Sequence, residues 1–264
     1  MTYILGSLPD EEKRLLTQAN IFDRTTQLFL NGIIRPGQKV IEIGPGTGGA
    51  SCIIAKLLAG QGTLTLLEKE HNYVDFLQQR LQINGIEKNN INILQKDFLQ
   101  HQPTEEFDVL YGRAILHHIP QAFKAIETYI KQMPSGGLVV FEEPIMSSTC
   151  AFPSSPAYQQ LTKLYLRLAH CLDIDLLIGK KLATEFSKMG LKVIKHRWTQ
   201  EALLTSTERN MLLGWLNAIT PALLSNQIVE IEEVTKLHHQ LQALVESNAT
   251  ILYIAFGQVV AQKV

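Results

Sequence analysis

A glycine-rich segment preceded by a carboxylate is the part of the sequence best suited to chemistry. It runs from Glu42 to Gly49 as Glu-Ile-Gly-Pro-Gly-Thr-Gly-Gly, with glycines at Gly44, Gly46 and Gly48. Glycine lets a chain turn sharply from strand to helix and removes the side chains that would keep a ligand away. The free N–H groups at the start of the following helix face the same space. The segment therefore predicts a loop that binds a nucleotide-like ligand.

Acidic residues also follow the next two predicted strands. Glu68 and Lys69 come directly after one strand, and Asp97 and Phe98 come after the next. A carboxylate in the first position can accept hydrogen bonds from both hydroxyls of a ribose. A carboxylate in the second position can meet the exocyclic amine of adenine. Glu42 would be a buried charge without a partner such as a ligand ammonium group or loop amides. Together these residues predict an adenosyl ligand.

The elements that must position these residues alternate between strand and helix. Seven strands are expected, and they lie at 39–43, 63–67, 90–94, 107–111, 138–141, 191–198 and 250–256. Helices with apolar residues at helical spacing separate the first five strands. This alternation predicts a doubly wound, mostly parallel α/β sheet. Right-handed crossovers then bring the carboxyl ends of the strands, and the loops after them, to one edge.

Candidate catalytic residues follow the fourth and fifth strands on that same edge. His117 and His118 come just after the fourth strand, and histidine has the ordinary pKa of a general base near neutral pH. Either histidine could instead pack at the start of the helix before Pro120. Glu142 and Glu143 follow the fifth strand, and one of them could line the pocket or pair with Arg113. The alternative is that they belong to a solvated or ion-paired turn.

These segments resemble the class I S-adenosylmethionine-dependent methyltransferases. More narrowly, they are similar to bacterial small-molecule methyltransferases that begin with a Tyr-x-Leu-Gly segment. The residues that carry the resemblance are Tyr3-Ile-Leu-Gly6, 39–49, Glu68, Asp97, Phe98, 107–113 and Gly179-Lys-Lys-Leu182. The resemblance covers most of residues 3–196 and is weak over 197–248.

The resemblance implies S-adenosyl-L-methionine as the cofactor and a Rossmann-like methyltransferase fold. The cofactor-binding residues that it implies are Gln18, Glu42, Gly44, Gly46, Gly48, Glu68, Lys69, Asp97, Phe98, Gly112 and Arg113. Of these, Gly112 and Arg113 would lie under the methionine portion, and Gln18 would touch its carboxylate. Glu68-Lys69 replaces the commoner aspartate of the family by a chemically equivalent residue.

The domain organisation expected is a single methyltransferase domain over 1–264. An N-terminal lid helix is expected at 1–31 and the cofactor-binding core at 32–145, with helical cap insertions at 146–178 and 200–247. An apolar cap favours a small lipophilic or aromatic methyl acceptor, because large polymers usually need an open, charged groove.

The composition of the chain limits the kinds of partner that we expect. The net charge of -1 and pI near 6.7 give no basic excess, so no nucleic acid is expected. No apolar run reaches the roughly 20 residues of a membrane span, and the first residues do not form a signal peptide. We therefore expect a cytoplasmic monomer or homodimer. The scattered cysteines and the adjacent His238 and His239 predict no metal site.

Two other classes of protein compete with a methyltransferase. Gly44, Gly46 and Gly49 also fit the dinucleotide fingerprint, which would suit an NAD(P)-linked oxidoreductase. The Tyr-x-x-x-Lys signature is missing, because Tyr158 and Lys163 are five residues apart. The second alternative is a non-catalytic partner protein that binds the cofactor. The leading hypothesis is methyl transfer to O, N or C of a small molecule.

Overall fold

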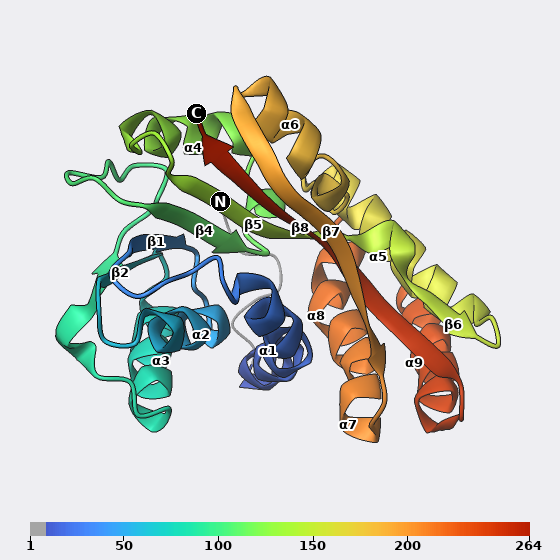
Figure 1. Ribbon diagram of the computed structural model, residues 1–264. Helices are drawn as coiled ribbons and strands as arrows, with labels where there is room; N and C mark the ends of the chain where they lie inside the picture. Colours follow the sequence, from blue (N-terminus) through green and yellow to red (C-terminus); the bar gives the residue numbers. More distant parts are fainter. Residues whose placement is uncertain (1–8) are drawn as a thin grey trace. The chain divides into compact units, whose positions relative to one another are not determined.

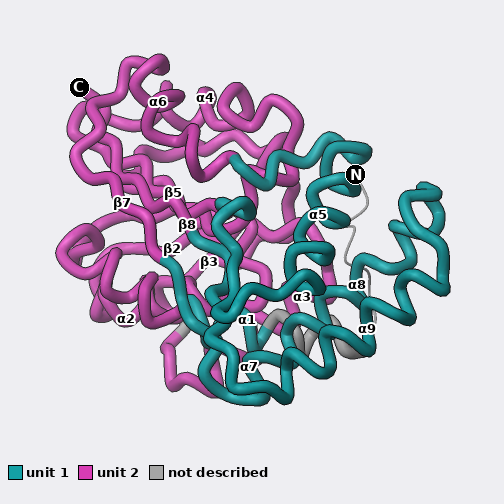
Figure 2. Tube along the Cα trace, turned by 90° about the vertical axis from the view of Figure 1, so that its right-hand side faces the viewer, with its two compact units in different colours: residues 1–22, 145–177, 200–255 teal, residues 23–144, 178–199, 256–264 magenta. Residues whose placement is uncertain are grey.

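The computed structural model describes residues 9–264, with side chains from residue 16 onward apart from that of Lys88 (Figure 1). The Tyr-x-Leu-Gly segment at 3–6 lies outside the described residues. The chain forms two compact units, which Figure 2 shows in different colours. Unit 1 takes residues up to 22, 145–177 and 200–255, and unit 2 takes 23–144, 178–199 and 256–264. Most of the predicted cap therefore falls in unit 1.

Unit 2 is built on a sheet whose first five strands are parallel. The strands are β1 Lys39–Ile43, β2 Thr63–Glu68, β3 Ile91–Gln95, β4 Val109–Arg113, β5 Leu138–Ile145, β7 Leu191–Leu203 and β8 Thr250–Lys263, of which the last three extend into unit 1. Hydrogen bonds set the order β3-β2-β1-β4-β5-β8, and β7 pairs with β8. Because β1 to β5 pair in parallel, their carboxyl ends lie at one edge.

Helices cover both faces of this sheet, as the predicted doubly wound fold requires (Figure 1). One face packs against α2 Gly49–Leu58, α3 His71–Ile83 and the end of α1 Pro9–Leu30. The other face packs against α4 Ala122–Gln132 and α6 Leu182–Lys188. Along β1 the side chains alternate, so that Val40 joins the first cluster while Ile41 and Ile43 join the second.

Unit 1 is mainly helical. Its longer helices are the early part of α1, α5 Pro156–Cys171, α8 Met211–Ser225 and α9 Ile231–Glu246, with the short α7 Ser206–Arg209. Strand β6 Cys150–Phe152 pairs antiparallel with the start of β8. The buried rings of Tyr165 and Trp215 meet edge to face at 5.2 Å between α5 and α8. None of the helices described is long and apolar enough to cross a membrane.

The structure differs from the predicted strands in several places. β5 continues to Ile145 and β7 to Leu203, four and five residues beyond the predicted ends, so the start of the predicted helical cap 200–247 is strand. The described sheet has eight strands rather than seven, because β6 forms inside the predicted cap. β4 starts at Val109, two residues later than expected. β8 continues to Lys263, beyond the predicted end at Phe256 and through Gly257. A Cβ at Gly257 would lie 2.2 Å from the Gly179 carbonyl oxygen, so this glycine permits a close approach of two backbones rather than a break.

The last residue of β8 also holds the end of a helix. The Lys263 ammonium group donates to the carbonyl oxygens of Ile130 at 2.9 Å, Lys131 at 3.0 Å and Met133 at 2.6 Å. These carbonyls close α4, where the last turn of a helix leaves oxygens without partners inside the helix. A cation there is also favoured by the helix dipole.

Replacing this lysine should therefore destabilise unit 2. Lys263→Met removes three charge-assisted hydrogen bonds, and we expect the free energy of unfolding in urea to fall by about 1–3 kcal/mol. Lys188→Met serves as the control, because Lys188 forms an exposed pair with Glu185 at 2.7 Å. Equal stability of the two variants would contradict the capping role.

Candidate functional site

The carboxyl edge of the parallel sheet gathers the predicted site residues of unit 2. Glu42 lies one residue before the end of β1, and Glu68 ends the neighbouring β2. On the other side of β1, β4 ends at Arg113, which pairs in register with Glu142 of β5. Asp97 follows β3 by two residues. The structure thus places these residues in one row along adjacent strands.

The glycine loop between β1 and α2 needs its glycines for two reasons. Gly44, Gly46 and Gly48 all have positive φ angles of 62°, 51° and 75°. A Cβ at Gly44 would lie 2.6 Å from Ile115, and one at Gly48 would lie 2.4 Å from Leu77. At Gly46 no described atom lies within 4 Å of the Cβ position. Gly46 is therefore the point of the loop that a ligand could approach closely.

Glu68 holds that loop in place. Its Oε2 accepts the Gly46 N–H at 3.0 Å, and its Oε1 accepts the Glu70 N–H at 3.0 Å. Burial raises the pKa of Glu68, and the backbone hydrogen bonds act in the opposite direction. Each carboxylate oxygen has a second lone pair, so the group can still accept hydrogen bonds from a diol.

Glu42 is the least compensated charge in the site. The residue is 2 % exposed, and within the described chain its Oε2 and the buried Ser51 Oγ have no hydrogen-bond partner. Burial raises the pKa of Glu42 from 4.5 to about 7, although Ser51 and Arg113 act in the opposite direction. A buried carboxylate without a partner costs free energy. A ligand cation at this place would compensate it, so the residues present fit a cationic adenosyl cofactor.

Asp97 and its neighbours have partners of their own. The Asp97 carboxylate lies 3.5 Å from the Lys69 ammonium group and accepts the Leu99 N–H at 3.0 Å. The Phe98 side chain is buried in the core of unit 2, and its carbonyl oxygen accepts the Tyr129 hydroxyl at 2.9 Å. The predicted contact of Asp97, Phe98 and Lys69 with the cofactor stays a prediction.

Arg113 is tied to α1. One of its Nη atoms donates to Asp23 at 3.0 Å, and the other donates to Thr26 at 2.9 Å. The Thr26 hydroxyl in turn donates to Glu142 at 3.1 Å. Asp23 and Thr26 were not among the predicted site residues, whereas Glu142 was one of the two acids expected to line the pocket or pair with Arg113. The spacing of the apolar residues of α1 predicted only a lid helix. Asp23 and Thr26 are three residues apart and therefore share one face of α1, which was the available signal of a polar contact.

Gly112 sits beside Arg113 in a tightly packed position. A Cβ there would lie 2.5 Å from the Phe141 ring, so the glycine is required by packing inside unit 2. The other predicted methionine-side residue, Gln18, is a half-buried residue of α1 in unit 1. The contacts of both residues with the cofactor stay predictions.

The three predicted catalytic residues lie together in unit 2. Glu143 is fully buried and accepts the N–H groups of Ile115 at 3.0 Å, Leu116 at 2.8 Å and His117 at 3.3 Å. It also lies 3.0 Å from His117 Nδ1. The centroid of the His118 ring lies 3.8 Å from that of His117, with the two rings tilted by 41°. Glu143 therefore pairs with His117, and its carboxylate anchors the short 3-10 helix Leu116–His118.

Burial also tunes the charge states of this cluster. It raises the pKa of Glu143 from 4.5 to about 7, although the three backbone amides lower it. Burial and then the neighbouring His117 hold the pKa of His118 well below its ordinary value. His118 is therefore neutral at pH 7, the state in which an imidazole can accept a proton.

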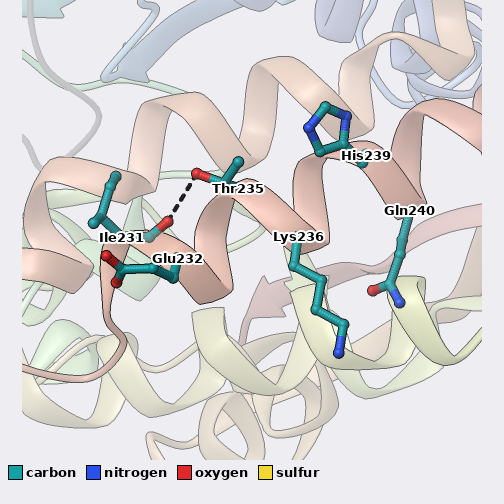
Figure 3. Close-up of a pocket in the computed structure, with 6 residues that line it drawn as sticks. All are labelled: Ile231, Glu232, Thr235, Lys236, His239 and Gln240. Atoms are coloured by element: carbon teal, nitrogen blue, oxygen red, sulfur yellow. Dashed lines mark hydrogen bonds between the residues drawn. The ribbon is translucent and has the colours of Figure 1, made fainter.

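Two cavities lie away from these residues. One, of about 540 Å³, is an open hollow along a single face of α9 in unit 1, and Figure 3 shows its lining side chains projecting from that helix. The other, of about 700 Å³, lies in unit 2 at the opposite edge of the sheet, beside Gly37, Gln38 and Gly136. Neither is lined by a predicted site residue.

A doubly wound parallel sheet, a glycine loop after β1 and an acidic residue at the end of β2 define a class of α/β proteins. Members of this class bind adenosine-containing cofactors at the carboxyl edge. A family model described as "Methyltransferase domain" matches residues 34–202. The chain therefore belongs to the methyltransferase domain family, and S-adenosylmethionine is the cofactor of this class I fold. The resemblance stated from the sequence is confirmed.

Individual relatives are distant. Residues of the chain are 24% identical over 143 residues to the ubiquinone/menaquinone biosynthesis C-methyltransferase UbiE of Vibrio campbellii, covering 53% of this chain and 55% of that protein. Phosphoethanolamine N-methyltransferase 1 of Arabidopsis thaliana is 26% identical over 134 residues, covering 50% and 26%. The chain spans about half the length of the first curated relatives it matches.

Solved structures share the fold. The crystal structure of the [4+2]-cyclase SpnF has a TM-score of 0.55 at 13% identity, with 91% of this chain and 81% of that chain covered. A fold of this kind therefore also carries chemistry other than methyl transfer. The activity of this chain is inferred from its site residues rather than from its fold.

The unpaired carboxylate of Glu42 makes a prediction about stability. Because its folded-state pKa lies above the ordinary value of 4.5, at about 7, the folded protein binds a proton more tightly than the unfolded chain. This stabilisation is fully present below about pH 4.5 and is lost as the pH rises through about 7. In Glu42→Gln, the decrease in the free energy of unfolding as the pH rises should be smaller than in the wild type by on the order of 2–3 kcal/mol.

The measurement is the free energy of unfolding in urea at pH 5 and at pH 7.5. The exposed Glu232→Gln serves as the control and should keep the wild-type pH dependence. If Glu42→Gln keeps it as well, Glu42 is not the uncompensated group that the structure describes.

Proposed function

We propose that this protein transfers a methyl group from S-adenosylmethionine to an O, N or C atom of a small lipophilic or aromatic molecule. The observation that carries the proposal is the buried carboxylate of Glu42, whose Oε2 has no partner in the described chain, beside a loop held open at Gly46. A sulfonium cofactor with an ammonium group supplies the missing positive charge. Glu68, at the end of the neighbouring strand, is proposed to accept hydrogen bonds from the ribose hydroxyls.

The chain has few chemical tasks in such a reaction. When bound, the cofactor supplies an activated methyl group on a sulfonium, so that the protein contributes mainly orientation and exclusion of water. Glu42 and Glu68 fix the ligand against the loop, and Asp97 is proposed to meet its adenine amine. Arg113 balances the nearby carboxylates.

His117 and Glu143 are proposed to serve when the acceptor carries a proton. Because Glu143 engages His117 at Nδ1, a proton taken from the acceptor would go to Nε2. The ionised Glu143 would then stabilise the imidazolium, as a carboxylate does for a histidine base. His118, neutral and in contact with the His117 ring, is the alternative acceptor of the proton.

Two of the relatives have names that fit a small acceptor, but these names do not agree on the atom that is methylated. UbiE is named a C-methyltransferase of ubiquinone and menaquinone biosynthesis, and the Arabidopsis protein is named a phosphoethanolamine N-methyltransferase. The oxidoreductase alternative loses its support, because the glycine loop it relied on belongs to the methyltransferase domain. The expected lid at 1–31, the cap segments, the cytoplasmic location and the monomeric or dimeric state stay predictions.

Calorimetric titration tests the cofactor. S-adenosylhomocysteine should bind, whereas NADH should not, and Glu68→Ala should weaken the binding by about 1–3 kcal/mol through lost charge-assisted hydrogen bonds. The exposed Glu232→Ala is the matched control. Binding of NADH alone would overturn the proposed function, and an unchanged affinity in Glu68→Ala would remove its assignment to the ribose.

Turnover tests the histidines. With a panel of phenols, amines and carboxylates, formation of S-adenosylhomocysteine is expected to identify an acceptor. For an acceptor that loses a proton, His117→Ala should lower kcat by about 10²–10⁴-fold, because the general base is gone. Glu143→Gln should lower it as well, since the amide cannot stabilise the imidazolium.

The exposed His196→Ala on β7 is the control and should leave kcat unchanged. Full activity of both His117→Ala and His118→Ala would show that the two rings only pack at the turn.

A further inference from the structure

One acidic residue of α1 joins two arginines at the glycine loop. The Asp23 carboxylate accepts from Arg113 at 3.0 Å through Oδ1 and from Arg80 at 3.2 Å through Oδ2. The side chains of Asp23, Arg113 and Arg80 are 23%, 14% and 15% exposed, so these ion pairs are partly shielded from water. All three residues belong to unit 2. They come from α1, β4 and α3, which are far apart in the sequence.

Both arginines also contact the surroundings of the loop. Arg80 donates to the carbonyl oxygen of Thr47 at 3.2 Å, within the glycine segment itself. Arg113 donates to Thr26, one turn beyond Asp23 on α1. The Asp23 carboxylate presses against the loop, since a Cβ at Gly49 would lie 2.5 Å from its Oδ1. The carboxylate therefore lies at the first residue of α2, where backbone N–H groups favour a negative charge.

A second observation points to a ligand at the same place. The Glu42 Oε2 and Ser51 Oγ atoms are buried and without partners in the described chain, and Ser51 lies in the first turn of α2. Asp23 and Arg113 both act electrostatically on Glu42. The cluster thus offers guanidinium groups, a carboxylate and an orphaned acceptor to one small space. This is the set of partners that an α-amino acid, with its ammonium and carboxylate groups, requires.

We propose that Asp23 is a positioning residue for the amino-acid end of the cofactor. It holds the guanidinium groups of Arg80 and Arg113 at the loop, where they receive the cofactor's carboxylate while Glu42 receives its ammonium group. The inference rests on the proposed function, because it assumes an S-adenosylmethionine-type ligand.

Charge balance supports this assignment. Asp23, Glu42 and Glu68 carry three negative charges when ionised, against two positive charges on Arg80 and Arg113. Glu142 also acts on Arg113 and adds to the negative charge. S-adenosylmethionine has a carboxylate, an ammonium and a sulfonium group, so its single net positive charge reduces the excess negative charge of the cluster. Without Asp23, two neighbouring guanidinium groups would repel each other and turn away from the loop.

Two ligands that differ only at the amino-acid end provide the test. S-adenosylhomocysteine contains that end, and 5′-methylthioadenosine lacks it but keeps the adenosine and the thioether. In Asp23→Asn, which keeps the shape and removes the charge, we expect S-adenosylhomocysteine to bind at least tenfold more weakly. The affinity for 5′-methylthioadenosine should stay within twofold of wild type. Both dissociation constants are measured by calorimetry on the full chain.

Controls separate positioning from folding. Asp75→Asn changes an exposed aspartate that pairs with His71 at 3.7 Å, and it should alter neither affinity. Arg80→Lys is a second variant, made on α3, which keeps the charge but loses the two-pronged contact with Asp23 and Thr47. It should show the same selective loss, and it keeps the proposal testable if Asp23→Asn does not fold.

The outcomes are distinct. Equal weakening of both ligands would overturn the proposal, because Asp23 would then only hold α1 or the loop. Unchanged affinity for both ligands would overturn it too. If the wild-type protein binds neither ligand, the proposed function itself fails, which is a different result from a loss of selectivity in the variants.

Discussion

The cost of burying carboxylates at the ends of parallel strands governs this structure. Each buried acid must find backbone amides, hydroxyls, a cation or a proton. Glu143 takes three backbone amides and His117, and Glu142 takes the Tyr111 hydroxyl at 2.6 Å together with Thr26 and Gln258. Only one of the described side-chain carboxylate oxygens, Oε2 of Glu42, is buried without a partner. The proposed cofactor site lies where a buried carboxylate lacks part of this compensation.

The same compensation connects the glycine loop to the rest of unit 2. Glu68 holds Gly46 through its backbone amide, so the loop conformation depends on the side chain that is proposed to meet the ribose. On the opposite side of the loop, Arg80 reaches Thr47 and Asp23. In addition to apolar packing, charged contacts therefore hold the glycine loop, helix α1 and the carboxyl edge together. Such contacts strengthen in a site from which water is excluded.

Much of the fold could be predicted because its signals are local. The alternating strands and helices of residues 39–145 follow from apolar runs and turn residues close in the sequence. The short β6 was missed, since three residues carry too little pattern to predict a strand. Phe98 shows how far the site residues could be predicted from the sequence. Its position after β3 predicted a ligand contact, but only the structure shows that its ring belongs to the core.

The sequence alone determined the glycine loop, the acidic residues after successive strands and the order of the elements. These depend on backbone conformation and on hydrophobic periodicity, which neighbouring residues encode. The tertiary structure decided which charges meet. Arg80 and Arg113 lie 57 and 90 residues from Asp23, on two other elements, and His117 meets Glu143 from 26 residues away. Such pairs depend on how helices and strands pack, and no local pattern specifies them.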